Sequence, residues 1–326
     1  MCFVINSKAK MKNLFKKKNF IVSILIIDAV IGCLLFRSRS FSHLAIWDII
    51  ESDKKEDFYW EPGHAPEYFN FEKNIDGLGV FKKDVLPLLG YEKDEFKIML
   101  KVAQFVRDMP SNDAKHYLRL RWDSPAMMLK QVKDGTVPNC FHRAILFSEY
   151  LSSIGIKSRL WALENEKFDR IAHTVAEVYV EDIKSWIFFD IMFGFYAMDT
   201  GRPLPFLGLR EKLLSGKDVT IVGQDAIPDF YRYLVRCVFL RTNNNFIDRY
   251  NNRYGIFSVF SSRLDKLPDN IRRGLGYLLG GQKDIFIHYT DDYSKSLKQK
   301  IFMAKLFFWF FISSPAFIGF ICAFME

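Results

Sequence analysis

The hydrophobic period of the chain changes in its middle from helical to strand-like, and this change limits the possible folds more than any other feature. Asn139 is a typical helix cap, and the run after it, up to Gly155, carries apolar residues at helical spacing. Three short runs rich in β-branched and aromatic residues follow, at 156–163, 172–181 and 184–193. One helix followed by three strands predicts an α+β domain with an antiparallel sheet.

Two more helices are predicted upstream. Residues 93–109 repeat apolar side chains at helical spacing and end before Pro110. Ser124 and Pro125 are typical of a helix cap and a first helical position, and Gly135 ends the helix that they begin. We therefore place the folded core at residues 93–200.

The segments on either side of this core have weaker patterns. Residues 37–92 are polar and aromatic with two turn signals, and we expect an irregular leader there. Residues 201–305 are predicted to form a mostly helical extension, with helices at 229–240 and near 264–280.

Both ends of the chain carry long apolar segments. Residues 306–325 contain no charged side chain, and residues 20–36 contain only Asp28. A helix needs about 20 apolar residues to cross a bilayer. We therefore predict a transmembrane helix at 306–325, a transmembrane or signal-anchor segment at 20–36, and the lipid bilayer as a partner. Buried core helices are the alternative.

The net charge of +8 is concentrated at the ends of the chain. Residues 1–19 form a basic tail with six lysines, whereas residues 41–290 contain equal numbers of basic and acidic side chains. This balance argues against a nucleic-acid partner, which selects for a basic face. The basic tail predicts an extracytoplasmic central domain, but four lysines just before residue 306 favour a cytoplasmic one, which stays as the alternative.

The cysteines do not predict a disulfide framework or a metal site. Of the five, only Cys140 and Cys237 lie between the two apolar segments, and the chain contains no CxxC motif. We expect no metal ion and no other cofactor.

Three side chains with complementary chemistry lie on the predicted helix start and on two predicted strands. Cys140 follows the Asn139 cap, where the helix dipole and free backbone amides favour a thiolate. His173 begins the second strand run and Asp190 comes late in the third. A tight turn near residue 182 would place this histidine almost opposite the aspartate, so that a carboxylate could orient an imidazole beside a thiol.

The sequence motifs around these residues resemble those of the transglutaminase-like superfamily of papain-like cysteine enzymes. That family has a cysteine at a helix start, a helix ending in G-I-x-(A/S)-R, a strand with His-x-x-x-Glu-Val-Tyr, and then a Trp and an Asp. This chain contains these motifs in the same order over about 60 residues. They are Cys140, 155–159, 173–179, Trp186 and Asp190. It departs from the pattern at Asn139, at Thr174 and at 191–192, which affects the expected substrate rather than the three reacting groups.

The resemblance implies a catalytic core with a Cys140–His173–Asp190 triad. Cys140 would attack an amide carbonyl, His173 would move the proton, and Asp190 would orient His173, with a thioester intermediate resolved by water or by an amine. The backbone N–H of Cys140 would help to stabilise the oxyanion, and Trp122 and Gln131 are candidates for a second donor. The implied substrate is a peptide, protein or cell-envelope amide.

Two other functions remain open at this stage. A catalytically idle module of the same fold could bind a partner in a membrane assembly, and two membrane spans could belong to a transport component. The complete set of Cys140, His173 and Asp190 argues against the first, and the lack of a polar stripe beyond Asp28 argues against the second.

Overall fold

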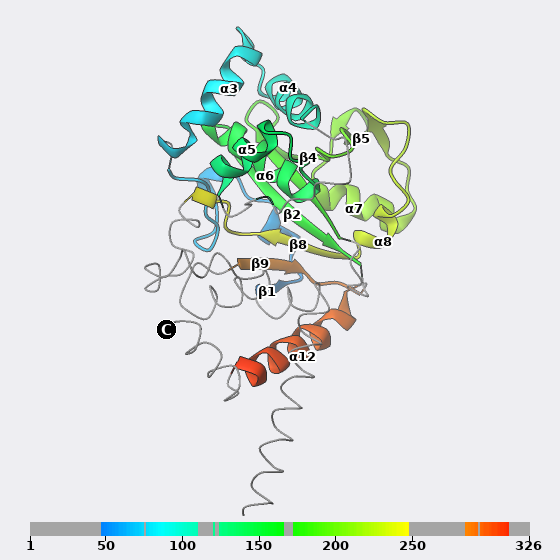
Figure 1. Cartoon of the computed structure of the whole chain (residues 1–326). Coiled ribbons are helices and arrows are strands. Elements are labelled where there is room, and N and C mark those ends of the chain that lie inside the picture. The colour runs from blue at the N-terminus through cyan, green and yellow to red at the C-terminus, as the bar shows by residue number, and fades with distance from the viewer. Residues whose placement is uncertain are drawn as a thin grey trace, which may run out of the picture. The chain divides into compact units, whose positions relative to one another are not determined.

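The structure, a computed structural model of the 326-residue chain, describes residues 47–74, 76–109, 120, 124–165, 172–247, 284–292 and 294–312 (Figure 1). The helices are α3 (Gly79–Leu89), α4 (Glu95–Arg107), α5 (Pro125–Lys133), α6 (Cys140–Ser153), α7 (Phe206–Ser215), α8 (Tyr231–Leu234) and α12 (Lys295–Ile312). The strands are β1 (Trp47–Ser52), β2 (Ser158–Glu164), β3 (Ala172–Val180), β4 (Ser185–Phe189), β5 (Tyr196–Asp199), β6 (Arg202–Pro203), β7 (Thr220–Val222), β8 (Cys237–Arg241) and β9 (Asp284–Tyr289). Short 3-10 helices lie at Lys55–Phe58, Pro62–His64 and Asp76–Leu78.

A mixed sheet forms the centre of the domain. Its strands within the described chain run in the order β1-β9-β8-β2-β3-β4. β1 and β9 are parallel, and the other neighbours are antiparallel. A small second sheet has the order β6-β5-β7. The predicted α+β class is confirmed, with one parallel pair that was not expected.

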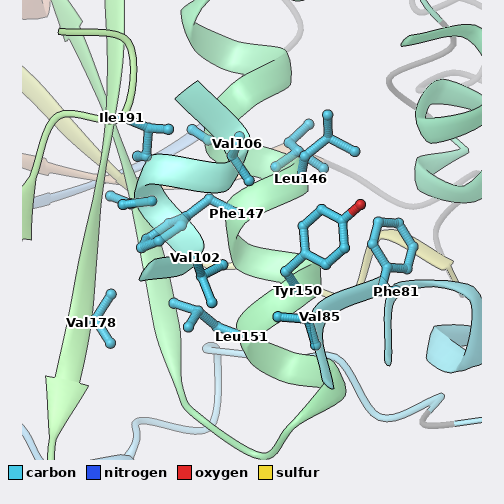
Figure 2. Close-up of a cluster of buried hydrophobic side chains, with 14 of the residues drawn as sticks. Phe81, Val85, Val102, Val106, Leu146, Phe147, Tyr150, Leu151, Val178 and Ile191 are labelled. Carbon is cyan, nitrogen blue, oxygen red and sulfur yellow. The ribbon is translucent and has the colours of Figure 1, made fainter. Parts of the chain in front are cut away.

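One face of the main sheet is covered by α3, α4, α5 and α6 (Figure 1). Val102 and Val106 of α4 pack with Phe147 and Leu151 of α6 and with Val178 of β3, and all five side chains are buried (Figure 2). This apolar layer fixes the position of α6, the helix that begins with Cys140.

The opposite face of the sheet is also buried. Adjacent strand residues point to opposite sides, so Val178 packs toward the four helices while Tyr179 packs with the second layer. That layer combines the segment after β1, α7 and α8, and it includes Phe58, Trp60, Phe206 and Tyr231. Burial on both faces explains why large apolar side chains lie on both sides of these strands.

The predicted helices and strands of the core are largely confirmed. The three helices expected between residues 93 and 155 are α4, α5 and α6, and the three strand runs are β2, β3 and β4. β3 and β4 are joined by the expected tight turn, with Tyr179 opposite Trp186.

The described part of the irregular leader predicted at 37–92 also contains regular structure. It contains β1, which pairs with β9, and the eleven-residue helix α3. α3 begins at Gly79 and contains Pro87, two residues that normally indicate loops. Its buried Phe81, Val85 and Leu89 nevertheless hold it on α6 and α4 by tertiary packing.

The described residues of the extension predicted at 201–305 include strands as well as helices. β8 and β9 come from this range and complete the main sheet, and only residues 231–234 of the helix expected at 229–240 are helical. β8 is buried at all five positions and its first four residues are apolar, so it lacks the strand-like alternation that would distinguish it from a helix. The helix expected near 264–280 lies outside the described residues.

The described residues up to Leu297 form one compact unit, and those from Lys298 onward belong to a second unit. Among the helices that the structure describes, none is both long enough and apolar enough to cross a bilayer. The predicted tail at 1–19 and the segment at 20–36 lie outside the described residues, and of 306–325 only residues 306–312, in α12, are described.

Candidate active site

The start of α6 is held by a reciprocal pair of hydrogen bonds. The Asn139 side-chain oxygen accepts from the backbone N–H of His142 at 3.1 Å, and the Asn139 backbone N–H donates to His142 Nδ1 at 3.4 Å. This capping box fixes the helix start, and it places the His142 ring at the helix cap. Cys140 is therefore the first residue of the helix and lies at the positive end of its dipole.

The backbone N–H of Cys140 is available to a bound molecule. No group in the described part of the chain accepts a hydrogen bond from it, since the Asn139 cap is engaged two residues further on. The thiol is free and half-buried. A carbonyl carbon attacked by the Cys140 sulfur would therefore have a backbone donor beside its oxygen.

Arg143 ties the first turn of α6 to the end of α4. Its guanidinium donates to the carbonyl oxygens of Val106, Arg107 and Met109 at 2.5, 3.0 and 3.2 Å. These are carbonyls at a helix terminus, which lack partners within the helix. The buried cation thus fixes Cys140, one helical turn away, against the C-terminal end of α4.

His173 and Asp190 meet at the ends of adjacent strands. His173 is the second residue of β3, Asp190 directly follows β4, and both side chains are buried. The His173 Nε2 lies 2.6 Å from Asp190 Oδ2, and the Cys140 thiol lies close enough to the imidazole to help raise its pKa. Because Nε2 faces the carboxylate, Nδ1 is the ring nitrogen left for the sulfur. The structure therefore brings all three predicted residues together in the predicted order.

The Asp190 carboxylate is held from three directions. Its Oδ1 accepts the backbone N–H of Phe193 at 3.0 Å, and its Oδ2 accepts the Tyr231 hydroxyl as well as facing His173. The turn 190–195 that supplies Phe193 is closed by bonds between the backbones of Asp190 and Phe195. A fully hydrogen-bonded carboxylate stays oriented even though it is completely buried.

The electrostatics of the site favour a charged imidazole. Burial lowers the pKa of His173, but the charge and hydrogen bond of Asp190, with a further contribution from Cys140, raise it to about 10. A histidine with this pKa carries its proton at neutral pH. An imidazolium between a thiol and a carboxylate is the arrangement that stabilises a thiolate nucleophile.

Tyr231 is a site residue that sequence reasoning missed. It belongs to the single-turn helix α8, and burial, the Asp190 charge and its hydrogen bond to Asp190 raise its pKa, so that it remains a neutral donor. It lies 41 residues beyond Asp190 in the chain, and no spacing pattern connects the two. The rings of Phe193 and Phe230 lie 5.6 and 5.7 Å from the His173 ring and complete an apolar enclosure.

The two predicted oxyanion donors have different outcomes. Trp122 lies outside the described residues. Gln131 is half-buried in α5, and its backbone carbonyl oxygen accepts a hydrogen bond from the Thr136 backbone N–H at 2.9 Å. Its role as a second donor stays a prediction.

Two other residues of the motif, Arg159 and Glu177, hold the sheet and its neighbouring helix together. Arg159 Nε donates to Glu177 Oε2 at 2.6 Å, and the guanidinium lies 4.1 Å from the centre of the Trp186 ring. Glu177 also accepts the Phe206 backbone N–H at 2.6 Å, which connects β3 to the start of α7. In this buried cluster Arg159 is paired with a neighbouring carboxylate.

Within the described ranges, no group of three or more His, Cys, Asp or Glu side chains is arranged to hold a metal ion. Comparison with protein-family models, with curated proteins and with solved structures finds no match for this chain.

Proposed function

We propose that this chain is a cysteine acyl-enzyme hydrolase or acyltransferase of the transglutaminase-like, papain-related type. The observation that carries the proposal is the hydrogen-bonded pair of His173 and Asp190 beside the Cys140 thiol, which lies at a helix start. A half-exposed thiol and a buried imidazole and carboxylate are what a nucleophile, its base and the group that orients the base require.

The proposed reaction begins with attack of the Cys140 thiolate on an amide carbonyl carbon. The oxyanion accepts a hydrogen bond from the Cys140 backbone N–H. The C–N bond then breaks as His173 gives its proton to the leaving amine, and a thioester remains on the sulfur. His173, now neutral, takes a proton from water or from an acceptor amine, which attacks the thioester and releases the acyl group.

Asp190 and Tyr231 keep their positions throughout these steps. Asp190 holds the imidazole ring and stabilises its charged form, and Tyr231 holds Asp190. Neither group needs to exchange a proton with the substrate.

The segments at 20–36 and 306–325 support the further proposal that the enzyme is anchored to a membrane. The basic tail favours an extracytoplasmic active site and therefore a cell-envelope or extracellular amide as substrate.

The test is the rate of Cys140 alkylation by iodoacetamide as a function of pH, in detergent-solubilised full-length protein. An isolated thiol ionises near pH 8.5. We expect the parent protein to be alkylated rapidly even well below pH 7. In His173→Ala, we expect the alkylation rate at acidic pH to be lost. Cys140→Ala measures the background from the other cysteines.

An ordinary thiol titration in both the parent and His173→Ala would overturn the enzyme proposal. The idle binding module would then be the better interpretation of the fold.

A further inference from the structure

A pocket of about 340 Å³ opens beside the turn that carries Asp190. Its walls come from α4, from the turn 190–195, from the start of β5 and from the end of β7. The volume is within the range of small-ligand sites. The pocket lies outside the triad, and the proposed mechanism does not use it.

Hydrogen bonds connect the pocket wall to Asp190 on one side and to α6, the helix of Cys140, on the other. On one side, Gly194 of the pocket wall donates its N–H to the Asp190 carbonyl at 2.7 Å. On the other, the carbonyl of Arg107 accepts from Arg143, which lies one helical turn after Cys140. A molecule in the pocket would therefore touch the two elements that hold the reacting groups.

Arg107 is the one cation among the described residues that line the pocket, and one of its nitrogens has no acceptor among them. Arg107 Nη2 donates to Gln104 Oε1 at 2.6 Å, and Arg107 Nε lies 3.9 Å from the exposed Asp108 carboxylate. No acceptor for Nη1 exists in the part of the chain that the structure describes. The half-buried guanidinium is thus only partly satisfied by the protein.

Two glycines leave room for this guanidinium. A Cβ on Gly194 would lie 2.1 Å from Arg107 Nη1, so any side chain there would displace the cation. A Cβ on Gly223 would lie 2.3 Å from the Gly194 carbonyl oxygen and would push the turn itself. Both glycines also have positive φ, at 73° and 101°, which other residues rarely adopt.

Apart from Gln104, the remaining side chains of the lining are apolar or aromatic. Ala103 lies one helical turn before Arg107, and Tyr196 faces the pocket from β5. Burial raises the pKa of Tyr196, so its ring remains neutral at physiological pH. The lining therefore fits a group with an apolar stem and one anionic end.

From this geometry we propose that the pocket is a substrate subsite for a carboxylate on a short apolar stem, such as an acidic side chain or a chain terminus. A carboxylate matches the planar guanidinium fork. One cation next to the Asp108 carboxylate suits a monoanion better than a phosphate dianion. The assignment as a substrate subsite rests on the proposed function, whereas the binding of a carboxylate does not.

The first experiment measures binding of 4-phenylbutyrate and of the neutral isostere 4-phenylbutyramide to the Cys140→Ala protein by calorimetry. We expect the acid to bind at least about tenfold more tightly than the amide, and this preference to be lost in Arg107→Gln. Arg202→Gln is the matched control, because Arg202 is exposed and does not line the pocket. Equal binding of acid and amide, a preference that survives Arg107→Gln, or tighter binding of inorganic phosphate would overturn the carboxylate assignment.

The second experiment connects the pocket to the reactive sulfur. The protein with Cys140 intact is alkylated by N-iodoacetyl-6-aminohexanoate and by its terminal amide. We expect the acid to react about tenfold faster than the amide, and this ratio to fall toward one in Arg107→Gln while iodoacetamide still reacts at the parental rate. A ratio unaffected by Arg107→Gln would remove the subsite from the reaction path. Acid-selective binding with an unreactive Cys140 would instead retain the pocket and overturn the enzyme proposal.

Discussion

Glu177 and Asp190 are two completely buried carboxylates on neighbouring strands, and the same three kinds of partner hold both. Each accepts one backbone N–H, from Phe206 for Glu177 and from Phe193 for Asp190. Each accepts one aromatic side-chain donor, the Trp161 indole or the Tyr231 hydroxyl. Each also faces a cationic side chain, Arg159 or His173.

The two clusters differ in the chemistry of the cation and in what lies beyond it. The Arg159 guanidinium stays charged and is enclosed by the rings of Trp60, Trp161 and Trp186. His173 can lose its proton and faces the half-exposed Cys140 thiol. The same way of burying a carboxylate therefore yields a structural cluster in one place and a reactive one in the other.

The largest effect that would test this comparison is on the stability of the structural cluster. Glu177→Gln leaves Arg159 as an uncompensated buried charge, and we expect it to lower the free energy of unfolding by about 3–5 kcal/mol. Urea denaturation measures the loss. Adding Arg159→Met should recover part of it, because both charges are then gone.

The protein that remains folded in Glu177→Gln should alkylate Cys140 at close to the parental rate. A folded but unreactive Glu177→Gln variant would show that the two clusters are not separate.

Asp190→Asn should have the opposite effect to Glu177→Gln, because it should greatly reduce the reactivity of Cys140. Without the carboxylate, the pKa of His173 falls from about 10 toward its ordinary value, and the imidazolium that supports the thiolate is lost. We expect the Cys140 alkylation rate at pH 6 to fall about 100-fold, close to the gap between a paired and an isolated thiol. A rate within threefold of the parent would contradict the assigned role of Asp190.

Tyr231→Phe should have an intermediate effect. It removes one hydrogen bond to Asp190 and keeps the buried ring, so we expect the reactivity at pH 6 to fall about tenfold. Tyr233→Phe is the matched control, because the Tyr233 side chain is 64% exposed in the same helix. Equal effects of the two substitutions would show that Tyr231 acts only through packing.

The smallest effect concerns Glu149, another buried carboxyl group, which among the described residues has none of the hydrogen-bond partners that hold Glu177 and Asp190. Neither oxygen of Glu149 has a hydrogen-bond partner in the described structure. Burial, followed by the charge of Glu72, raises its pKa, so the folded state keeps a proton that the unfolded state releases above about pH 4.5. Stability must therefore fall as the pH rises above this value.

We expect Glu149→Gln to be about 1 kcal/mol more stable than the parent at pH 8 and equal to it near pH 4.5. Thermal unfolding at both pH values measures this difference, with the exposed Glu56→Gln as control. A parent whose stability rises relative to Glu149→Gln with pH would show that the carboxyl is ionised in the folded state.

The sequence could predict elements whose signals are local. α4 and α6 follow from apolar period and caps, and the facing of His173 and Asp190 follows from the short turn between β3 and β4. The order of the three reacting groups could be predicted because these local signals place them: one helix start supplies Cys140, and one hairpin supplies His173 and Asp190.

The features that were missed depend on long-range pairing. β8 is buried at every position and shows no alternation, so no hydrophobic period identifies it as a strand, and β1 is assigned only by its pairing with β9. Tyr231 and Arg107 reach the site from elements far away in the sequence, and only tertiary packing brings them to it.

The parallel pairing of β1 with β9 also has a consequence for how the domain is made. Of the described strands, β1 leaves the ribosome first, but its only neighbour in the described sheet is the last of them, more than 200 residues later. Closing so long a loop is entropically costly, and contacts distant in sequence slow folding. We expect the β9 edge to close last, so a chain released before residue 284 would expose β8 as an unpaired edge prone to aggregation.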